Sequence, residues 1–102
     1  MAIGQLNGAI TLGANASAAG NWMTWIGGKG IFSAEGTFNL GSVALEFMSL
    51  NGTAIPVTDT WGSLTKLSAQ GDMHFELPPG QIRMNVSGSP SAMYVYAIGE
   101  VQ

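Results

Sequence analysis

The feature that most constrains the fold of this sequence is a series of short segments in which apolar and polar residues alternate. Gly, Asn, Pro and Ser separate these segments, and no window repeats apolar residues at the i, i+3, i+4 and i+7 spacing of an amphipathic helix. A period of two places successive side chains on opposite faces of a β-strand. The chain is therefore predicted to be all-β, and its 102 residues fit one domain spanning residues 1–102.

About eight short strands, with turn signals at spacings of roughly 8 to 12 residues, indicate an antiparallel two-sheet β-sandwich. The jelly-roll and the immunoglobulin-like topologies both fit this pattern, so the strand order stays open. The strands are expected at residues 5–12, 21–26, 31–38 and 42–50, around Pro56, at 64–67, in the two halves of 72–87, and at 92–101.

The segment around Asn51 and Gly52 predicts a hairpin whose register follows from the apolar pattern. A three-residue loop that ends at a left-handed Gly52 pairs Phe47 with Ile55 and gathers the apolar residues of both strands on one face. Pro56 lies in the second strand and has no N–H to donate. This strand is therefore expected to be an edge strand or to bulge.

A second hairpin is predicted between residues 72 and 87, with Pro79 and Gly80 at the centre of a type II turn. Its register places three apolar pairs on one face. On the opposite face it sets Glu76 against Arg83, which predicts an ion pair between the two strands.

Charged residues make up only 9% of the chain, whereas about a quarter is usual for a soluble domain. So weakly charged a surface indicates that part of it is covered by another copy or another protein; an uncharged polar surface of Ser, Thr, Asn and Gly is the alternative. The net charge is −3, and the cations are Lys29, Lys66 and Arg83, which form no basic stripe for a phosphate backbone. Nucleic acid is therefore not expected as a partner.

Residues that carry chemistry are few. Cysteine is absent and His74 is the only histidine, so neither a thiolate site nor a His-rich metal site is expected. The stretch from Gly27 to Gly30 includes Lys29, but a strand follows where a phosphate-binding loop requires a helix, so a sharp turn is expected there. We therefore expect no catalytic residue, no metal and no cofactor, and predict that the protein is not an enzyme.

Two further absences concern targeting. No positively charged segment followed by an apolar run precedes residues 14–16, which otherwise resemble a signal-peptidase site. No apolar stretch approaches the roughly 18 residues of a membrane-spanning helix. The sequence is therefore expected to encode a leaderless protein that starts at Met1 and has no membrane partner.

Aromatic residues are the remaining candidates for function. Tryptophan is favoured where one protein anchors in another and where sugars stack on a ring, but a sandwich of this size usually buries one in its core. The last predicted strand has no clearly polar face, which indicates burial on both sides, within the fold or against a partner. The predicted interface residues are Trp22, Trp25, Lys29 and Trp61, in or beside loops, and Tyr94 and Tyr96 on the last strand.

Several segments together resemble a known class of phage proteins. These segments are residues 25–38 (WIGGKGIFSAEGTF), residues 43–47 (VALEF) with the Asn-Gly turn after them, and residues 75–83 (FELPPGQIR). They are similar to small β-sandwich proteins encoded beside the capsid genes of tailed bacteriophages, the decoration or cement proteins. The resemblance covers residues 22–101 and includes no catalytic residue.

The resemblance implies a virion protein, made in the host cytoplasm, that binds the outside of the capsid lattice between subunits of the major capsid protein. It also implies a small homo-oligomer, a dimer or trimer, because symmetric lattices favour symmetric binders. Two alternatives stay open. One is a carbohydrate- or receptor-binding sandwich that uses exposed tryptophans, and the other is a minor tail or head-tail structural protein.

Overall fold

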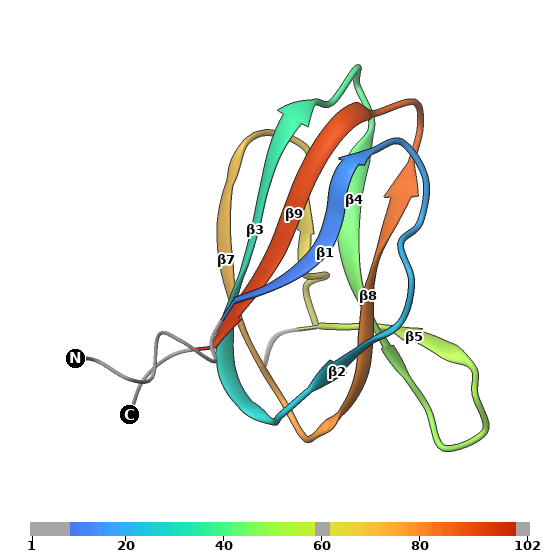
Figure 1. The fold of residues 1–102 in the computed structure, drawn as a ribbon, viewed down its shortest axis with the longest axis vertical. Helices are drawn as coiled ribbons and strands as arrows, with labels where there is room; N and C mark the ends of the chain where they lie inside the picture. Colours follow the sequence, from blue (N-terminus) through green and yellow to red (C-terminus); the bar gives the residue numbers. More distant parts are fainter. Residues whose placement is uncertain (1–8, 59–61, 100–102) are drawn as a thin grey trace.

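Nine β-strands form the regular structure of this computed structural model, which describes residues 9–58 and 62–99 (Figure 1). No helix long and apolar enough to cross a membrane occurs in those two ranges. The strands are β1 (Ala9–Ala16), β2 (Met23–Trp25), β3 (Gly28–Thr37), β4 (Ser42–Met48), β5 (Ala54–Pro56), β6 (Lys66–Leu67), β7 (Gly71–Leu77), β8 (Gly80–Ser87) and β9 (Ser91–Gly99).

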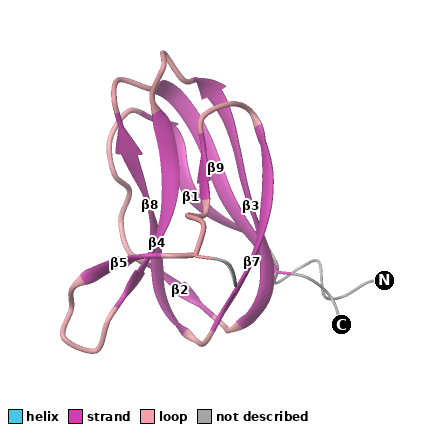
Figure 2. Ribbon diagram, turned by 180° about the vertical axis from the view of Figure 1, so that it is seen from behind, coloured by secondary structure: helices cyan, strands magenta, loops and turns pink. Residues whose placement is uncertain are grey.

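The strands pair as a nested set of antiparallel partners. β1 pairs with β9, β2 with β8, β3 with β7 and β4 with β5. Further pairing of β3 with β9 and of β4 with β8 completes two sheets, in the orders β1-β9-β3-β7 and β2-β8-β4-β5, and β6 also pairs with β4. The two sheets lie face to face, as the reverse view shows (Figure 2).

This nested order is that of a jelly roll, in which two four-stranded layers are wound from one long folded hairpin. In an immunoglobulin-like sandwich the first two strands are neighbours in one sheet, whereas β1 and β2 lie in different sheets. The predicted all-β, two-sheet sandwich is confirmed. The described strands number nine, against about eight expected, and the short strand expected at residues 64–67 is present as β6.

Alternate side chains of each strand fill the space between the sheets. On β9, Met93, Val95 and Ala97 point inward and are fully buried, and on β3 Phe32 and Ala34 do the same. Burial of each large apolar side chain contributes about 1.5–3 kcal/mol. The facing sheet supplies Trp25, Val43, Leu45, Ile82 and Met84, and Val57, the residue after β5, joins them.

Trp25 lies in this core with only 1% of its surface exposed. Its ring contacts that of Phe75 with centroids 5.0 Å apart and planes tilted by 50°. A Cβ on Gly30 would lie 2.7 Å from both rings, so no side chain fits at that position. The expectation that at least one tryptophan belongs to the core is met by Trp25, and its prediction as a contact residue is wrong because the fold covers its ring.

The hairpin predicted for residues 72–87 is wrong in its pairing. β7 belongs to the four-stranded sheet and β8 to the five-stranded sheet, so the turn between them crosses from one sheet to the other. The face predicted to be apolar is nevertheless directed into the core, where Phe75 and Met84 are buried from opposite sides. Alternation alone does not distinguish strands paired edge to edge from strands stacked face to face.

A second crossing, from β2 to β3, lies beside this one at the same end of the sandwich (Figure 1). Gly27 and Gly28 both have φ of 99°, and a Cβ on Gly27 would lie 2.9 Å from the ring of Pro79. The two crossings approach so closely that only glycine fits. The turn predicted for residues 27–30 is therefore shorter than expected, since Lys29 and Gly30 already belong to β3.

The predicted register of the other hairpin is confirmed. Phe47 pairs with Ile55, and Gly52 is left-handed with φ of 83°, as a three-residue loop requires. Pro56 lies in β5, an edge strand that pairs only with β4, also as expected.

The contact between Gly30 and the aromatic rings can be tested by adding one methyl group. Gly30→Ala is expected to destabilise the protein by about 1–3 kcal/mol, because the core cannot accommodate the new atom without moving two rings. Gly71→Ala on the neighbouring strand is the matched control, since its Cβ would meet atoms at 3.9 and 4.0 Å and its effect should stay within about 0.5 kcal/mol. Urea unfolding measures both. Equal stability of the two variants would contradict the close packing of Gly30 against the rings of Trp25 and Phe75.

Candidate interaction surfaces

The described residues hold no group of three or more His, Cys, Asp or Glu side chains that could bind a metal ion. The acidic side chains that they contain are divided between the two outer faces of the sandwich. Glu46 lies on the five-stranded sheet, whereas Glu35, Asp72 and Glu76 lie on the four-stranded sheet. The candidates for function are therefore these two faces and the exposed loop tips.

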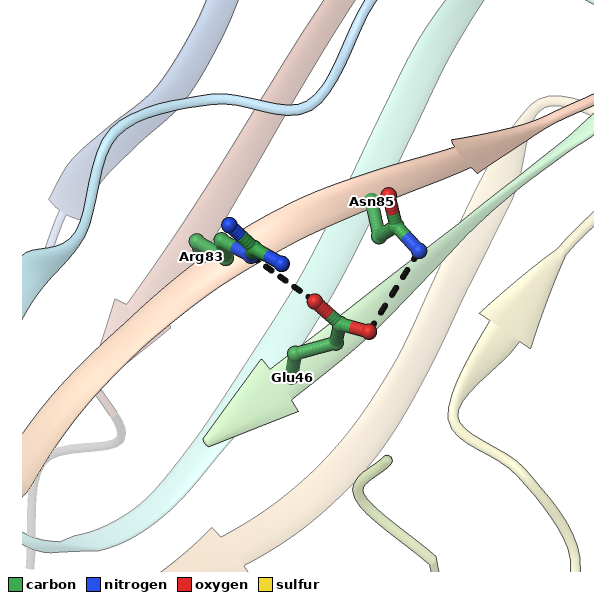
Figure 3. A network of polar contacts seen from close by, with 3 residues as sticks. All are labelled: Glu46, Arg83 and Asn85. Atoms are coloured by element: carbon green, nitrogen blue, oxygen red, sulfur yellow. Dashed lines mark hydrogen bonds and ion pairs between the residues drawn. The ribbon is translucent and has the colours of Figure 1, made fainter. Parts of the chain in front are cut away.

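A polar cluster lies on the outer face of the five-stranded sheet, where Glu46 of β4 accepts two hydrogen bonds from β8 (Figure 3). Arg83 Nε donates to Oε1 at 2.8 Å, and Asn85 Nδ2 donates to Oε2 at 3.3 Å. The register explains the first contact, because Glu46 and Arg83 are directly paired residues. Both charged side chains are mostly buried: 14% of the surface of Glu46 and 27% of that of Arg83 are exposed.

The ion pair predicted between Glu76 and Arg83 is thus wrong. Glu76 lies on β7 in the other sheet, opposite Lys29, while Arg83 contacts Glu46. The error follows directly from the incorrect hairpin, since the sequence contains a second carboxylate, Glu46, at an outward position of a strand that neighbours β8.

Trp22, the residue before β2, extends this cluster. Glu46, Arg83, Asn85 and Trp22 are together called the Trp22 cluster. The guanidinium of Arg83 lies over its ring, 4.6 Å from the centroid, so one face of the indole is covered by a cation. Nearby, Gln81 Nε2 donates to the hydroxyl of Thr24 at 3.2 Å. On this surface the charges of Glu46 and Arg83 neutralise each other, and the ring of Trp22 is held by stacking against the guanidinium.

The outer face of the four-stranded sheet, here called the tyrosine face, differs in character. It is centred on β9, whose outward residues Tyr94, Tyr96 and Ile98 are all apolar or aromatic. Tyr94 and Ile98 have 38% and 37% of their surfaces exposed. The inward side of this strand is in the core as expected, while its outward side is open in the isolated chain.

Strand pairing arranges the tyrosine face in rows, with an apolar centre and charges at its ends and along β7. Lys29 begins the face on β3 and Glu35 ends it, with Ile31 and Ser33 between them. From one end to the other, the rows contain Lys29 and Glu76; Ala9, Ile98, Ile31 and His74; Thr11, Tyr96, Ser33 and Asp72; and Tyr94 and Glu35.

The structure separates the six interface residues predicted from the sequence. Three share one face, one lies on the opposite face, one is in the core and one falls outside the described residues. They are, in that order, Lys29, Tyr94 and Tyr96; Trp22; Trp25; and Trp61.

Sequence reasoning missed an exposed residue at a loop tip, Leu40. Asn39 and Leu40 have φ of 49° and 64°, and the N–H of Gly41 donates to the carbonyl of Phe38 at 2.7 Å, the pattern of a type I′ turn. Such turns favour Asn-Gly, and a leucine in the left-handed region costs about 1–2 kcal/mol. The side chain gains no contact in return, since it is 106% exposed. Asn39 and Gly41 mark the turn in the sequence, but Leu40 was not recognised as strained.

Comparisons with known proteins add one structural relationship. The sequence matches no family model and no curated protein. Among solved structures, the fold is similar to that of the SPBc2 prophage-derived protein YomS, with a TM-score of 0.69 over 88% of each chain and 13% sequence identity. The two proteins therefore share a fold.

The Glu46–Arg83 contact gives a prediction that separates the observed pairing from the one expected from sequence. Glu46→Ala should destabilise the protein by about 1–3 kcal/mol, because partly buried Arg83 and Asn85 lose their acceptor. Glu76→Ala should change stability by less than about 0.5 kcal/mol. Double-mutant cycles with Arg83→Ala, measured by urea unfolding, should show coupling for Glu46 alone. Coupling between Glu76 and Arg83 would contradict the observed pairing and support the hairpin predicted from the sequence.

The strained turn predicts that a leucine can be removed with a gain in stability. Leu40→Gly is expected to stabilise the isolated protein by about 1 kcal/mol, since glycine adopts a positive φ without a steric penalty. Leu50→Gly is the control, because Leu50 is equally exposed at 107% but its φ is not positive. Thermal unfolding should show a higher midpoint only for the first variant. A lower midpoint for Leu40→Gly would mean that the turn is not strained.

Proposed function

We propose that this chain is a phage structural protein that binds the outer surface of a capsid lattice and stabilises it, without catalysis. The observation that carries the proposal is the jelly-roll fold, which is shared over 88% of both chains with a prophage-derived protein. It agrees with the resemblance of residues 25–38 and 75–83 to cement proteins of tailed phages. The partner would be the major capsid protein, and the protein would be located on the outside of the virion.

The surface supports a contact with another protein. Charged residues are 9% of the chain, and the centre of the tyrosine face carries aromatic and aliphatic side chains, as do the centres of protein interfaces, whereas the opposite face carries an ion pair that is neutral overall. Leu40 is a fully exposed apolar side chain held in a costly conformation, which is a feature of residues kept for binding. We therefore assign the loop tip at Leu40 and the Trp22 cluster to capsid contact.

Stabilisation would follow from mass action. A protein that binds the assembled shell but not its dissociated subunits shifts the equilibrium toward the shell, by about 2.7 kcal/mol per site at a concentration one hundred times the Kd. A lattice repeats this gain at every equivalent site. No chemical step is needed.

A carbohydrate-binding role is the second candidate. Tyr94 lies beside Glu35, and Tyr96 lies in the next row, where Ser33 separates it from Asp72; aromatic rings near carboxylates suit a sugar ring and its hydroxyls. Against it, the described tryptophans form no platform: Trp25 is buried, and Arg83 covers one face of the ring of Trp22. A minor tail or head-tail protein of the same fold is the third candidate.

Co-sedimentation with particles of the same phage tests these alternatives. The wild-type protein should pellet with mature capsids at a saturable stoichiometry and raise the temperature at which the shells disrupt. Leu40→Gly should bind about tenfold more weakly although it is the more stable protein, and Leu50→Gly should bind as the wild type does. Binding to purified tails but not capsids would favour the tail candidate. Retention on glycan surfaces without binding to either particle would favour the carbohydrate candidate and overturn the proposal.

A further inference from the structure

The tyrosine face has an exposed apolar centre, in which Tyr94 and Ile98 of β9 have 38% and 37% of their surfaces exposed. Tyr96 and Ile98 of β9 lie beside Ser33 and Ile31 of β3, in the two middle strands of the sheet. An apolar centre with charged residues at its margins is the anatomy of a protein interface rather than of a surface evolved to face water.

The charges of this face are arranged so that the face complements itself. Among its described residues Lys29 is the single Lys or Arg, and it lies at the beginning of β3, whereas Glu35 lies near the end of the same strand. At the rise of an extended strand, about 3.3 Å per residue, these two outward side chains are about 20 Å apart. The midpoint between them falls between Ile31 and Ser33, at the apolar centre.

We propose that a second copy of this chain packs on the tyrosine face, related to the first by a twofold axis that runs across the strands. This rotation reverses the strand direction and keeps β3 over β3. It places Lys29 of each copy opposite Glu35 of the other, so two ion pairs form at the ends of the interface. At the centre, Tyr96 lies over Ile98 of the second copy.

The alternative twofold axis, parallel to the strands, does not bring these charges together. It places β3 over β9, so that Glu35 faces Tyr94 of the second copy and Lys29 gains no carboxylate from β3. In the proposed dimer, Asp72 and Glu76 of both copies lie on β7, at the margin of the face. Salt in the surrounding water screens the repulsion between the carboxylates of the two copies over a Debye length of about 8 Å at physiological ionic strength. Among the described residues, charge complementarity therefore favours the axis across the strands.

The size of the face suits a modest dimer. Four strands spaced about 4.8 Å apart, with seven residues of about 3.3 Å each, cover an area of roughly 20 by 23 Å. Two such faces together bury about 900 Å², close to the roughly 1,000 Å² expected of a specific interface. Face-to-face sheets pack about 10 Å apart, a distance that lysine and glutamate side chains can span between them.

This inference does not depend on capsid binding, since it concerns the purified chain alone and leaves the Trp22 cluster and the Leu40 tip exposed on each copy. The test is sedimentation velocity over a series of protein concentrations at physiological ionic strength. The wild-type protein should sediment as twice the 10.6 kDa chain at high concentration. A monomer at every concentration, or a trimer, would overturn the proposal.

Charge exchange tests the arrangement of the two copies. Lys29→Glu and Glu35→Lys should each weaken the dimer at least about tenfold, because each opposes like charges twice. An equimolar mixture of the two variants should dimerise again, since Glu at position 29 then faces Lys at position 35, and Lys29 faces Glu35, across the interface. Failure of the mixture to recover would exclude the axis across the strands.

Two further variants separate the interface from general effects on folding. Tyr96→Ser removes the central aromatic ring and should weaken the dimer about thirtyfold. Lys66→Glu makes the same charge change as Lys29→Glu but lies on β6 in the other sheet, so it should leave the dimer unchanged. Thermal unfolding verifies that each variant is folded. Equal weakening by Lys66→Glu would mean that net charge, and not the tyrosine face, controls association.

Discussion

The contact between Trp25 and Phe75 joins the two sheets at the end of the sandwich where the chain crosses between them twice. Trp25 ends β2 in one sheet, and Phe75 lies on β7 in the other, with ring centroids 5.0 Å apart. Glycine makes room for this packing on both sides. Gly30 lies against the two rings, and Gly80, opposite Trp25 in the register, lies against the ring of Phe47. The aromatic rings thus occupy the space that side chains at Gly30 and Gly80 would need. The two crossings can be short because these rings fill the end of the core beneath them.

The sequence allowed prediction of several features that depend on local periodicity. The alternation identified which residues of β3 and β4 face inward, and the loop at Gly52 gave the pairing of Phe47 with Ile55 because both partners belong to one local hairpin. The alternation did not distinguish the inward from the outward side of β9, because both sides of that strand are apolar. It did not allow prediction of which strands are neighbours. A turn with Pro79 and Gly80 serves equally well to join two strands of one sheet or to carry the chain across the core. In a jelly roll most successive strands lie in opposite sheets, so the hairpin predicted between β7 and β8 was wrong. The predicted ion pair between Glu76 and Arg83 depended on that hairpin and was wrong for the same reason.

The interface residues were harder to predict because an aromatic side chain has the same appearance in a sequence whether it fills a core or meets a partner. Trp22 and Trp25 are separated by only two residues, yet one stacks under a guanidinium at the surface and the other is buried. Trp25 lies within β2 and packs against Gly30, whereas Trp22 precedes the first residue of β2. Leu40 is a different case. Its exposure was invisible in the apolar pattern, and only its positive φ shows that the local structure opposes the residue found there.

Two edge strands of the sandwich, β1 and β5, are poorly suited to pairing with a strand of another chain. β1 is interrupted by two register shifts, between Thr11 and Gly13 and between Gly13 and Ala16, so its outer edge presents no regular ladder. β5 is three residues long and contains Pro56. Short, bulged or proline-containing edge strands resist pairing with another chain. The two outer faces differ in character: the tyrosine face has an apolar centre, whereas the other carries the ion pair of Glu46 and Arg83, so the two faces are suited to different partners.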